Sequence, residues 1–293
     1  MNNLKRDTKC SLILLGTAFL FAVVFSTCGK ECRSCKACKD LTVEELSITN
    51  DIQGVIIEGP WEVIITQDSS KNSAVLEYCE SVKDKVTSKL LPNGYLHIKL
   101  STVGHSYCYS NIVFRANINA VCLERIEASG AVEIRTYGHF RSLKEISLSG
   151  ASSVNGLSSE GLAAKIDLSG ASILKAFTFL GNSMDAKISG ASEMRFDNID
   201  LDYCTVNLLG ASLFSGGGYA VKTVFDGSGA SHFNTFNLES KNLDIDLSGA
   251  SEAEVTVNSA IKGKLTGASM LKYKGGASVS GVSTSGASSI KPL

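Results

Sequence analysis

The sequence predicts an all-β protein whose larger part is a single-stranded, right-handed parallel β-helix with coils of about 20 residues. The main observation is a Gly-Ala step that recurs nine times at spacings of 18 to 20 residues, and Ser follows the Ala in every copy but the first. A fixed period near 20 is typical of a solenoid, in which each coil buries its apolar face only against its neighbours. The nine repeat glycines are Gly130, Gly150, Gly170, Gly190, Gly210, Gly229, Gly249, Gly267 and Gly286.

The second observation is the apolar pattern around each glycine. The positions four and two residues before the glycine, and four after it, are mostly apolar; Ile146, Leu148 and Val154 occupy them in the second copy. This period of two indicates strands with one inward face, and no segment carries a 3.6-residue apolar stripe of helical length. The pattern also lacks the Leu-x-x-Leu-x-Leu core of a leucine-rich repeat. Connections between strands wound in this way are expected to be right-handed.

The Gly-Ala-Ser step itself predicts a corner of the coil. Glycine suits a position where a Cβ would collide with the next coil or where φ must be positive. Two orientations of the following residues are open. If the chain stays extended, Ser points inward and forms a buried ladder of hydroxyl groups. If the glycine reverses the alternation, Ala lies inside and Ser lines the outer face.

The first 27 residues are predicted to be a signal peptide. Lys5, Arg6 and Lys9 precede an apolar stretch over residues 12–25, and Cys28 follows it almost directly. The apolar stretch is too short to span a bilayer comfortably. We expect Cys28 to be lipidated and residues 28–44 to form a flexible tether; plain secretion and an uncleaved anchor are the alternatives. The expected location is the cell envelope, as an outer-membrane lipoprotein of a Gram-negative bacterium that faces the surface or the periplasm.

Two regions follow the tether. Residues 45–120 are expected to be β-rich without the Gly-Ala period, with a buried strand from Trp61 to Thr66 and a turn at Pro92-Asn93-Gly94. Residues 121–293 are expected to form the repeat β-helix. Trp61 is expected to be a core residue.

Four segments together resemble a known family. They are Gly54–Gln67, Asn93–Ile98, the repeated Leu-Ser-Gly-Ala-Ser, and the closing Leu271–Ser278. The chain resembles the family described as "putative auto-transporter adhesin, head GIN domain", exported bacterial proteins of unknown function, over about residues 52–290. The resemblance implies a right-handed β-helix and supplies no catalytic residue. Gly-Ala-Ser stands after Tyr273-Lys274-Gly275, where the family's pattern has Gly-Asn-Pro.

The nine cysteines contain one metal-like spacing, Cys28-x₃-Cys32-x₂-Cys35-x₂-Cys38. Four clustered thiols can hold zinc or an iron–sulfur cluster. Their place directly after an export signal favours disulfides or incidental tether composition instead. The remaining cysteines are expected to be buried and free, with a pair among the first three as the alternative: Cys79, Cys108, Cys122 and Cys204.

No pattern of catalytic residues stands out. The four histidines share no spacing, and the alternating acids are typical of outward positions on strands rather than of a calcium site. We therefore expect no catalytic residue, no cofactor and no metal. A net charge of −1 gives no indication of the basic surface that nucleic-acid-binding proteins carry. The residues considered were His97, His105, His139 and His232, with Asp197, Asp200, Asp202, Asp244 and Asp246.

The resulting functional hypothesis is a non-enzymatic lipoprotein that presents a repetitive surface, held to the membrane through its lipid. Its partner would be a glycan, an envelope or host protein, or another copy of the chain. The alternative is a carbohydrate-active enzyme, a polysaccharide lyase or hydrolase, which would need a groove with two carboxylates about 5–10 Å apart. A third hypothesis is a purely architectural envelope protein.

Overall fold

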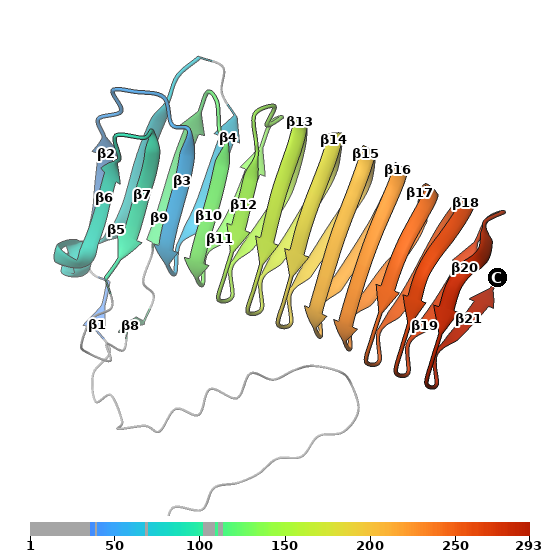
Figure 1. Ribbon diagram of the computed structural model, residues 1–293. Coiled ribbons are helices and arrows are strands. Elements are labelled where there is room, and N and C mark those ends of the chain that lie inside the picture. Colours follow the sequence, from blue (N-terminus) through green and yellow to red (C-terminus); the bar gives the residue numbers. More distant parts are fainter. Residues whose placement is uncertain (1–35, 39, 68–69, 102–108, 111–113) are drawn as a thin grey trace, which may run out of the picture.

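The protein is a nearly all-β parallel solenoid of about 8 turns, which confirms the predicted fold class. The computed structural model describes residues 36–38, 40–67, 70–101, 109–110 and 114–293. Figure 1 shows an elongated, flattened tube whose coils advance from the N-terminal end to the C-terminal end, with tight turns aligned along one long edge. The predicted signal peptide and Cys28 lie outside the described residues.

Long strands form the regular part of the tube. Each starts after a Gly-Ala-Ser turn, bends, and returns to the next turn, so one strand contributes to both faces (Figure 1). Successive strands pair in parallel, as Val154 with Leu174 and Leu168 with Ile188. The strands are β13 (Ser153–Leu168), β14 (Ile173–Ile188), β15 (Glu193–Gly210), β16 (Leu213–Gly229), β17 (His232–Leu247) and β18 (Glu252–Leu265), followed by β19 (Met270–Lys274), β20 (Ser278–Thr284) and β21 (Ser289–Pro292).

The first coils are divided into shorter strands. These are β3 (Gly54–Gly59), β4 (Glu62–Gln67), β10 (Arg125–Gly130), β11 (Glu133–Tyr137) and β12 (Glu145–Leu148). Strand β10 pairs in parallel with β3, and β11 pairs in parallel with β4. Gly130 is the register partner of Gly59, so the glycine column begins one coil before the first Gly-Ala step. The β-rich segment before residue 121 therefore supplies the first coil of the same solenoid.

Antiparallel strands close the N-terminal end. Strand β5 (Ser73–Cys79) pairs antiparallel with both β2 (Leu41–Leu46) and β9 (Phe114–Ala120), while β6 (Val86–Leu90) pairs antiparallel with β7 (Tyr95–Leu100). A short 3₁₀ helix, η1 (Glu80–Lys85), joins β5 to β6. Strands β9 and β7 pair in parallel with β4 and β3, so this cap continues both faces of the tube.

Part of the expected tether is structured, which corrects the prediction for residues 36–44. Strand β1 (Lys36–Ala37) pairs with β8 (Tyr109–Ser110), and β2 begins at Leu41. A disulfide joins Cys38 to Cys79, with Cα atoms 5.6 Å apart. The expectation that Cys79 is free was therefore wrong, because its thiol is bonded to a cysteine of the presumed tether.

The core runs along the inside of the tube, and it contains the apolar positions that the alternation predicted. Ile146, Leu148 and Val154 are fully buried, as are their equivalents in most coils. Aromatic rings fill the wider places: Phe225 stacks on Phe233 with centroids 4.6 Å apart. Burying one large apolar side chain contributes about 1.5–3 kcal/mol, so stability is distributed over many similar coils.

The glycine corner has two physical requirements. All nine repeat glycines have φ between +72° and +99°, a region that L-residues with a Cβ rarely occupy. At Gly190 a Cβ would also lie 2.4 Å from the carbonyl oxygen of Gly170, the glycine one coil earlier. The approach is close because each following alanine N–H donates to that same oxygen; the Ala191 bond is 2.8 Å long.

Serine points inward at this corner and alanine outward. Ser152 and Ser172 are fully buried, whereas Ala151 is exposed. The Ser152 hydroxyl donates to the carbonyl of Ser149, 2.8 Å away, so the side chain closes its own turn. Most later copies repeat this bond, at 2.6–2.8 Å. The positive-φ corner therefore preserves the alternation, and the hydroxyl groups lie inside.

Candidate functional site

A large groove lies away from the glycine edge, on the second halves of β13 and β14 and the adjoining part of β15. It is open to solvent and has a volume of about 760 Å³. Tyr203 and Leu162 border it, and their side chains are 58% and 79% exposed. We call it the Tyr203 groove; its other lining residues include Glu124, Arg141, Lys144, Ala163, Lys165, Ser183, Asp185 and Thr205.

A second open groove, of about 630 Å³, lies on the other side of Leu162. The half-buried Leu180 borders this groove, and Tyr219 and Val221 are exposed apolar side chains on β16, with Asp200 of β15 between Leu180 and Tyr219. All five residues stand seven to ten positions before the glycine of their coil. We call this set the apolar corner: Leu162, Leu180, Tyr203, Tyr219 and Val221.

The corner is built by close packing of the backbone. Gly181 is the register partner of Gly161, and a Cβ on Gly181 would lie 1.8 Å from the Gly161 carbonyl oxygen. Only glycine fits at this distance. The missing side chains leave the space beside Leu162 open, which explains why grooves flank that side chain.

Ion pairs hold two lysines of the Tyr203 groove in place. Lys144 lies 2.7 Å from Glu124, and Lys165 lies 3.0 Å from Asp167. The hydrogen bond that Lys165 donates to Asp167, followed by the charge of Asp167, raises the pKa of Lys165, and Glu124 similarly raises the pKa of Lys144. Both lysines therefore stay charged at neutral pH, and their charges are largely compensated by these partners.

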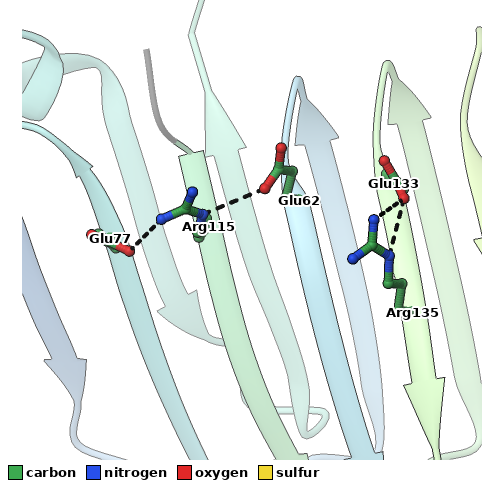
Figure 2. A network of polar contacts seen from close by, with 5 residues as sticks. All are labelled: Glu62, Glu77, Arg115, Glu133 and Arg135. Atoms are coloured by element: carbon green, nitrogen blue, oxygen red, sulfur yellow. Dashed lines mark hydrogen bonds and ion pairs between the residues drawn. The ribbon is translucent and has the colours of Figure 1, made fainter. Parts of the chain in front are cut away.

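Another polar site lies near the N-terminal end of the solenoid. Figure 2 shows Arg115 between two carboxylates, with Nη1 3.3 Å from Glu77 and Nε 3.4 Å from Glu62. In the neighbouring coil, Arg135 donates to Glu133 over 2.8 Å. A pocket of about 180 Å³ lies between these groups.

This pocket holds two carboxylates on adjacent strands but lacks a feature that the enzyme hypothesis needs. Glu62 and Glu133 are register partners on adjacent parallel strands, which places their backbones about 4.8 Å apart. The two side chains are, however, 71% and 45% exposed, and a guanidinium binds each. A glycosidase acid needs a carboxyl that is shielded from water. The arrangement fits a surface ion network better than a catalytic pair.

The structure distributes the sequence-predicted site residues over the whole solenoid. The nine glycines form one column along the edge with the tight turns. His97 contacts Glu58 at 2.8 Å, and His232 lies 3.9 Å from Glu252. Asp244 is paired with Lys222 at 2.6 Å. No group of three or more potential metal ligands occurs among the described residues.

The cysteines do not form a cluster within the described part of the chain. Cys38 is in the disulfide, whereas Cys28, Cys32 and Cys35 lie outside the described residues, as do Cys108 and His105. Cys204 is fully buried, and burial raises the pKa of its thiol to about 12. Cys122 is half-buried and contacts the hydroxyl of Ser142. Trp61 is buried, as predicted.

Sequence reasoning missed the apolar corner and the Tyr203 groove. A signal was present: Leu162 follows Gly161 where the alternation predicts an outward side chain, and Tyr203 stands where earlier coils have Ala163 and Ser183. The alternation identifies only the inward positions, so the outward change from Ala163 and Ser183 to Tyr203 does not by itself predict a groove.

Comparisons with known proteins agree on one family. Residues 51–277 match the family described as "Putative auto-transporter adhesin, head GIN domain". None of the curated proteins compared with the chain matches it. Within the described residues, no helix has both the length and the apolar character needed to cross a bilayer.

Several solved structures share the fold at 15% sequence identity. A "putative adhesin" from Parabacteroides merdae aligns with a TM-score of 0.60, over 87% of this chain and 97% of its own. A "putative lipid binding protein" from Parabacteroides distasonis gives 0.64, over 89% and 100%. A "putative adhesin" from the same species gives 0.62 with the same coverage. At this identity the likeness concerns the fold alone.

Proposed function

Because this chain belongs to the head GIN domain family, we propose that it is a non-enzymatic, adhesin-like protein of the cell envelope that binds a partner at the apolar corner. The observation that carries the proposal is the exposure of Leu162, 79% in solvent, between two open grooves. Exposed apolar groups gathered beside concave surfaces and surrounded by polar residues are typical of interaction sites.

The solenoid suits such a role because it is a rigid frame. The backbone contacts along the glycine column fix each coil relative to the next. Side chains at the apolar corner are consequently held at the spacing of the strands, about 4.8 Å per coil. A preorganised surface binds with a smaller loss of conformational entropy than a flexible one.

The membrane attachment is part of the proposal. Cys28 follows an apolar export segment directly, and its acylation would anchor the protein in the outer membrane. Each buried methylene of the lipid contributes about 0.8 kcal/mol, so several acyl chains give a durable anchor. Replacing Cys28 with Ser should move the protein from the membrane fraction to the soluble fraction, and an unchanged distribution would contradict lipidation there.

The binding role is tested by adherence. Beads coated with the purified protein should adhere to host matrix or envelope material, and Leu162→Asp should reduce adherence at least several-fold. Leu209→Asp is the matched control, because Leu209 is also an exposed leucine (51%) but lies beside the glycine column. Equal adherence of wild type and Leu162→Asp would remove the apolar corner from the proposal.

Exposure of the protein on the outer surface of the cell is tested separately, on intact cells. We expect an added protease to degrade the protein on whole cells without lysis, because an adhesin must face the medium. Protection in whole cells and degradation only after permeabilisation would favour the periplasmic, architectural alternative.

A further inference from the structure

We propose that the Tyr203 groove is a binding site for a short, neutral oligosaccharide of about two sugar units, which stacks on Tyr203 and donates a hydroxyl to Asp185. This inference rests on the proposed function and names the chemical class of the partner. It is carried by the shape of the groove, the exposure of one aromatic ring, and the arrangement of the polar groups at its border.

The shape follows from one column of register partners. Ala163, Ser183 and Tyr203 occupy the same position in three successive coils. The two small side chains leave a trough beside the tyrosine ring. Because adjacent strands are about 4.8 Å apart, two coils give the trough a length of roughly 10 Å, which is the length of a disaccharide.

The tyrosine ring gives the trough an apolar end. Tyr203 is 58% exposed, so its ring is open to a ligand. The C–H face of a pyranose ring packs well against an aromatic face, while the sugar hydroxyls remain free for hydrogen bonds. The next residue in the column, Lys222, lies beyond the tyrosine and is paired with Asp244 at 2.6 Å, so Tyr203 itself forms the end of the trough.

Polar groups line the neighbouring column. Lys165, Asp185 and Thr205 are register partners there, one column beyond the buried Ala164, Met184 and Cys204. Within the described part of the chain, no ion pair engages the Asp185 carboxylate, so its oxygens can accept hydrogen bonds from a ligand. Thr205 and Ser183 add hydroxyl groups that can either donate or accept.

The charge balance favours a neutral ligand. The three cations of the lining each lie within ion-pair distance of a carboxylate: Lys144 of Glu124, Lys165 of Asp167 and Arg141 of Glu160. The Asp185 carboxylate would repel an acidic sugar. A protein partner is less well matched, because the groove is open to solvent and the small side chains Ala163 and Ser183 form its floor, so the groove does not enclose an anchoring residue.

The experiment is a titration of the full-length protein in detergent with neutral oligosaccharides of two to six sugars, of the gluco, manno, galacto and N-acetylglucosamine types. Acidic sialylated and uronate-containing oligosaccharides are tested in parallel. We expect at least one neutral series to bind, and the acidic counterparts to bind more weakly. Affinity is measured by calorimetry after a first comparison on an array.

Variants localise the site. Tyr203→Ala should lower the affinity about 10-fold or more, whereas Tyr203→Phe keeps the ring and should retain affinity within about 3-fold. Asp185→Asn should lower it about 5- to 10-fold, through loss of a charged acceptor. Ala163→Trp should block the trough. The control is Tyr137→Ala, because Tyr137 is 54% exposed on another part of the surface and should not affect binding.

Three results would overturn the inference: no neutral oligosaccharide binds, Tyr137→Ala weakens binding as much as Tyr203→Ala, or acidic sugars bind best. Circular dichroism and unfolding curves verify that each variant is folded. If Leu162→Asp abolishes adherence while no oligosaccharide binds, the apolar corner contacts a protein or a second copy. In that case the proposed function stands and the sugar site is rejected.

Discussion

Between Gly150 and Gly286 each corner of the solenoid carries Gly-Ala-Ser, whereas the first two corners carry Gly59-Pro60-Trp61 and Gly130-Ala131-Val132. In the regular coils a glycine Cβ would lie 2.4–2.7 Å from the preceding glycine oxygen, and at Gly130 the nearest atoms of Gly59 are 3.1 Å away. The backbone contact is therefore tight in the regular part and looser at the N-terminal end.

The residue that points inward at the first corner differs from the serine of the later corners, although it makes the same kind of hydrogen bond. The indole Nε1 of Trp61 donates to the carbonyl of Glu58, three residues earlier, over 3.2 Å. The serine hydroxyls of most later corners make the same bond. Trp61 also packs on Phe114, with ring centroids 5.3 Å apart. The comparison teaches that the glycine is common to every corner. An inward donor adds a hydrogen bond at most of them, whereas Val132 fills that position at the second corner without a donor.

The largest expected loss of stability comes from adding a side chain where the glycine column is tightly packed. Gly190→Ala places a Cβ at φ +78° and 2.4 Å from a backbone oxygen. Strain and overpacking together should lower the free energy of unfolding by about 3–5 kcal/mol. Urea unfolding measures the loss. Gly276→Ala, which has 3.7 Å to its nearest atom, is the control and should change little. Gly130→Ala should fall between the two.

The second prediction concerns the N-terminal end of the solenoid, where a disulfide joins strand β5 to the segment before β2. The Cys38–Cys79 disulfide closes a loop across 41 residues. Cys38→Ser should lower stability by about 3 kcal/mol, because the unfolded chain regains loop entropy. Hydrogen exchange should accelerate in β2 and β5 before it does in β15 or β16. Cys122→Ser is the control, and equal protection of β2 in both variants would contradict this division.

A smaller effect is expected from the inward donor. Ser212→Ala removes the hydroxyl that donates to the carbonyl of Leu209 over 2.8 Å, which should cost about 1 kcal/mol. Trp61→Phe removes the equivalent donor at the first corner and keeps most of the ring. Similar losses in urea unfolding would support a common role for the two residues. Ser169→Ala, at an exposed position, should leave stability unchanged.

The smallest expected change in stability comes from two like charges on adjacent strands of the regular coils. Asp226 and Asp246 are register partners, and burial, followed by the charge of Asp246, raises the pKa of Asp226. The folded-state pKa of Asp226 is higher than its unfolded-state pKa. Ionised Asp226 therefore destabilises the fold at pH values above the folded-state pKa, and this destabilisation is lost as the pH falls from the folded-state pKa to the unfolded-state pKa. Asp226→Asn should therefore add about 0.2–1 kcal/mol at pH 7. The gain should shrink towards acidic pH, and a gain that grows there would contradict the assignment. Asp202→Asn is the control.

The period of the Gly-Ala step and the alternation around it determined most of the fold from the sequence. A repeated glycine at fixed spacing can only be satisfied by stacking corners, and period-two apolar residues can only face a common interior. The same features fixed which side chains of the repeats form the core, such as Ile146 and Leu174.

Tertiary structure alone decided the rest. The orientation of Ser152 depends on how the chain leaves a positive-φ corner, and the pairing of Cys38 with Cys79 depends on a contact between distant segments. The Tyr203 groove arises where Gly161 packs against Gly181 and where small outward side chains precede Tyr203 in one column. The period of 20 residues places Ala163, Ser183 and Tyr203 in that column, but only the stacked coils show that the space beside the tyrosine is open.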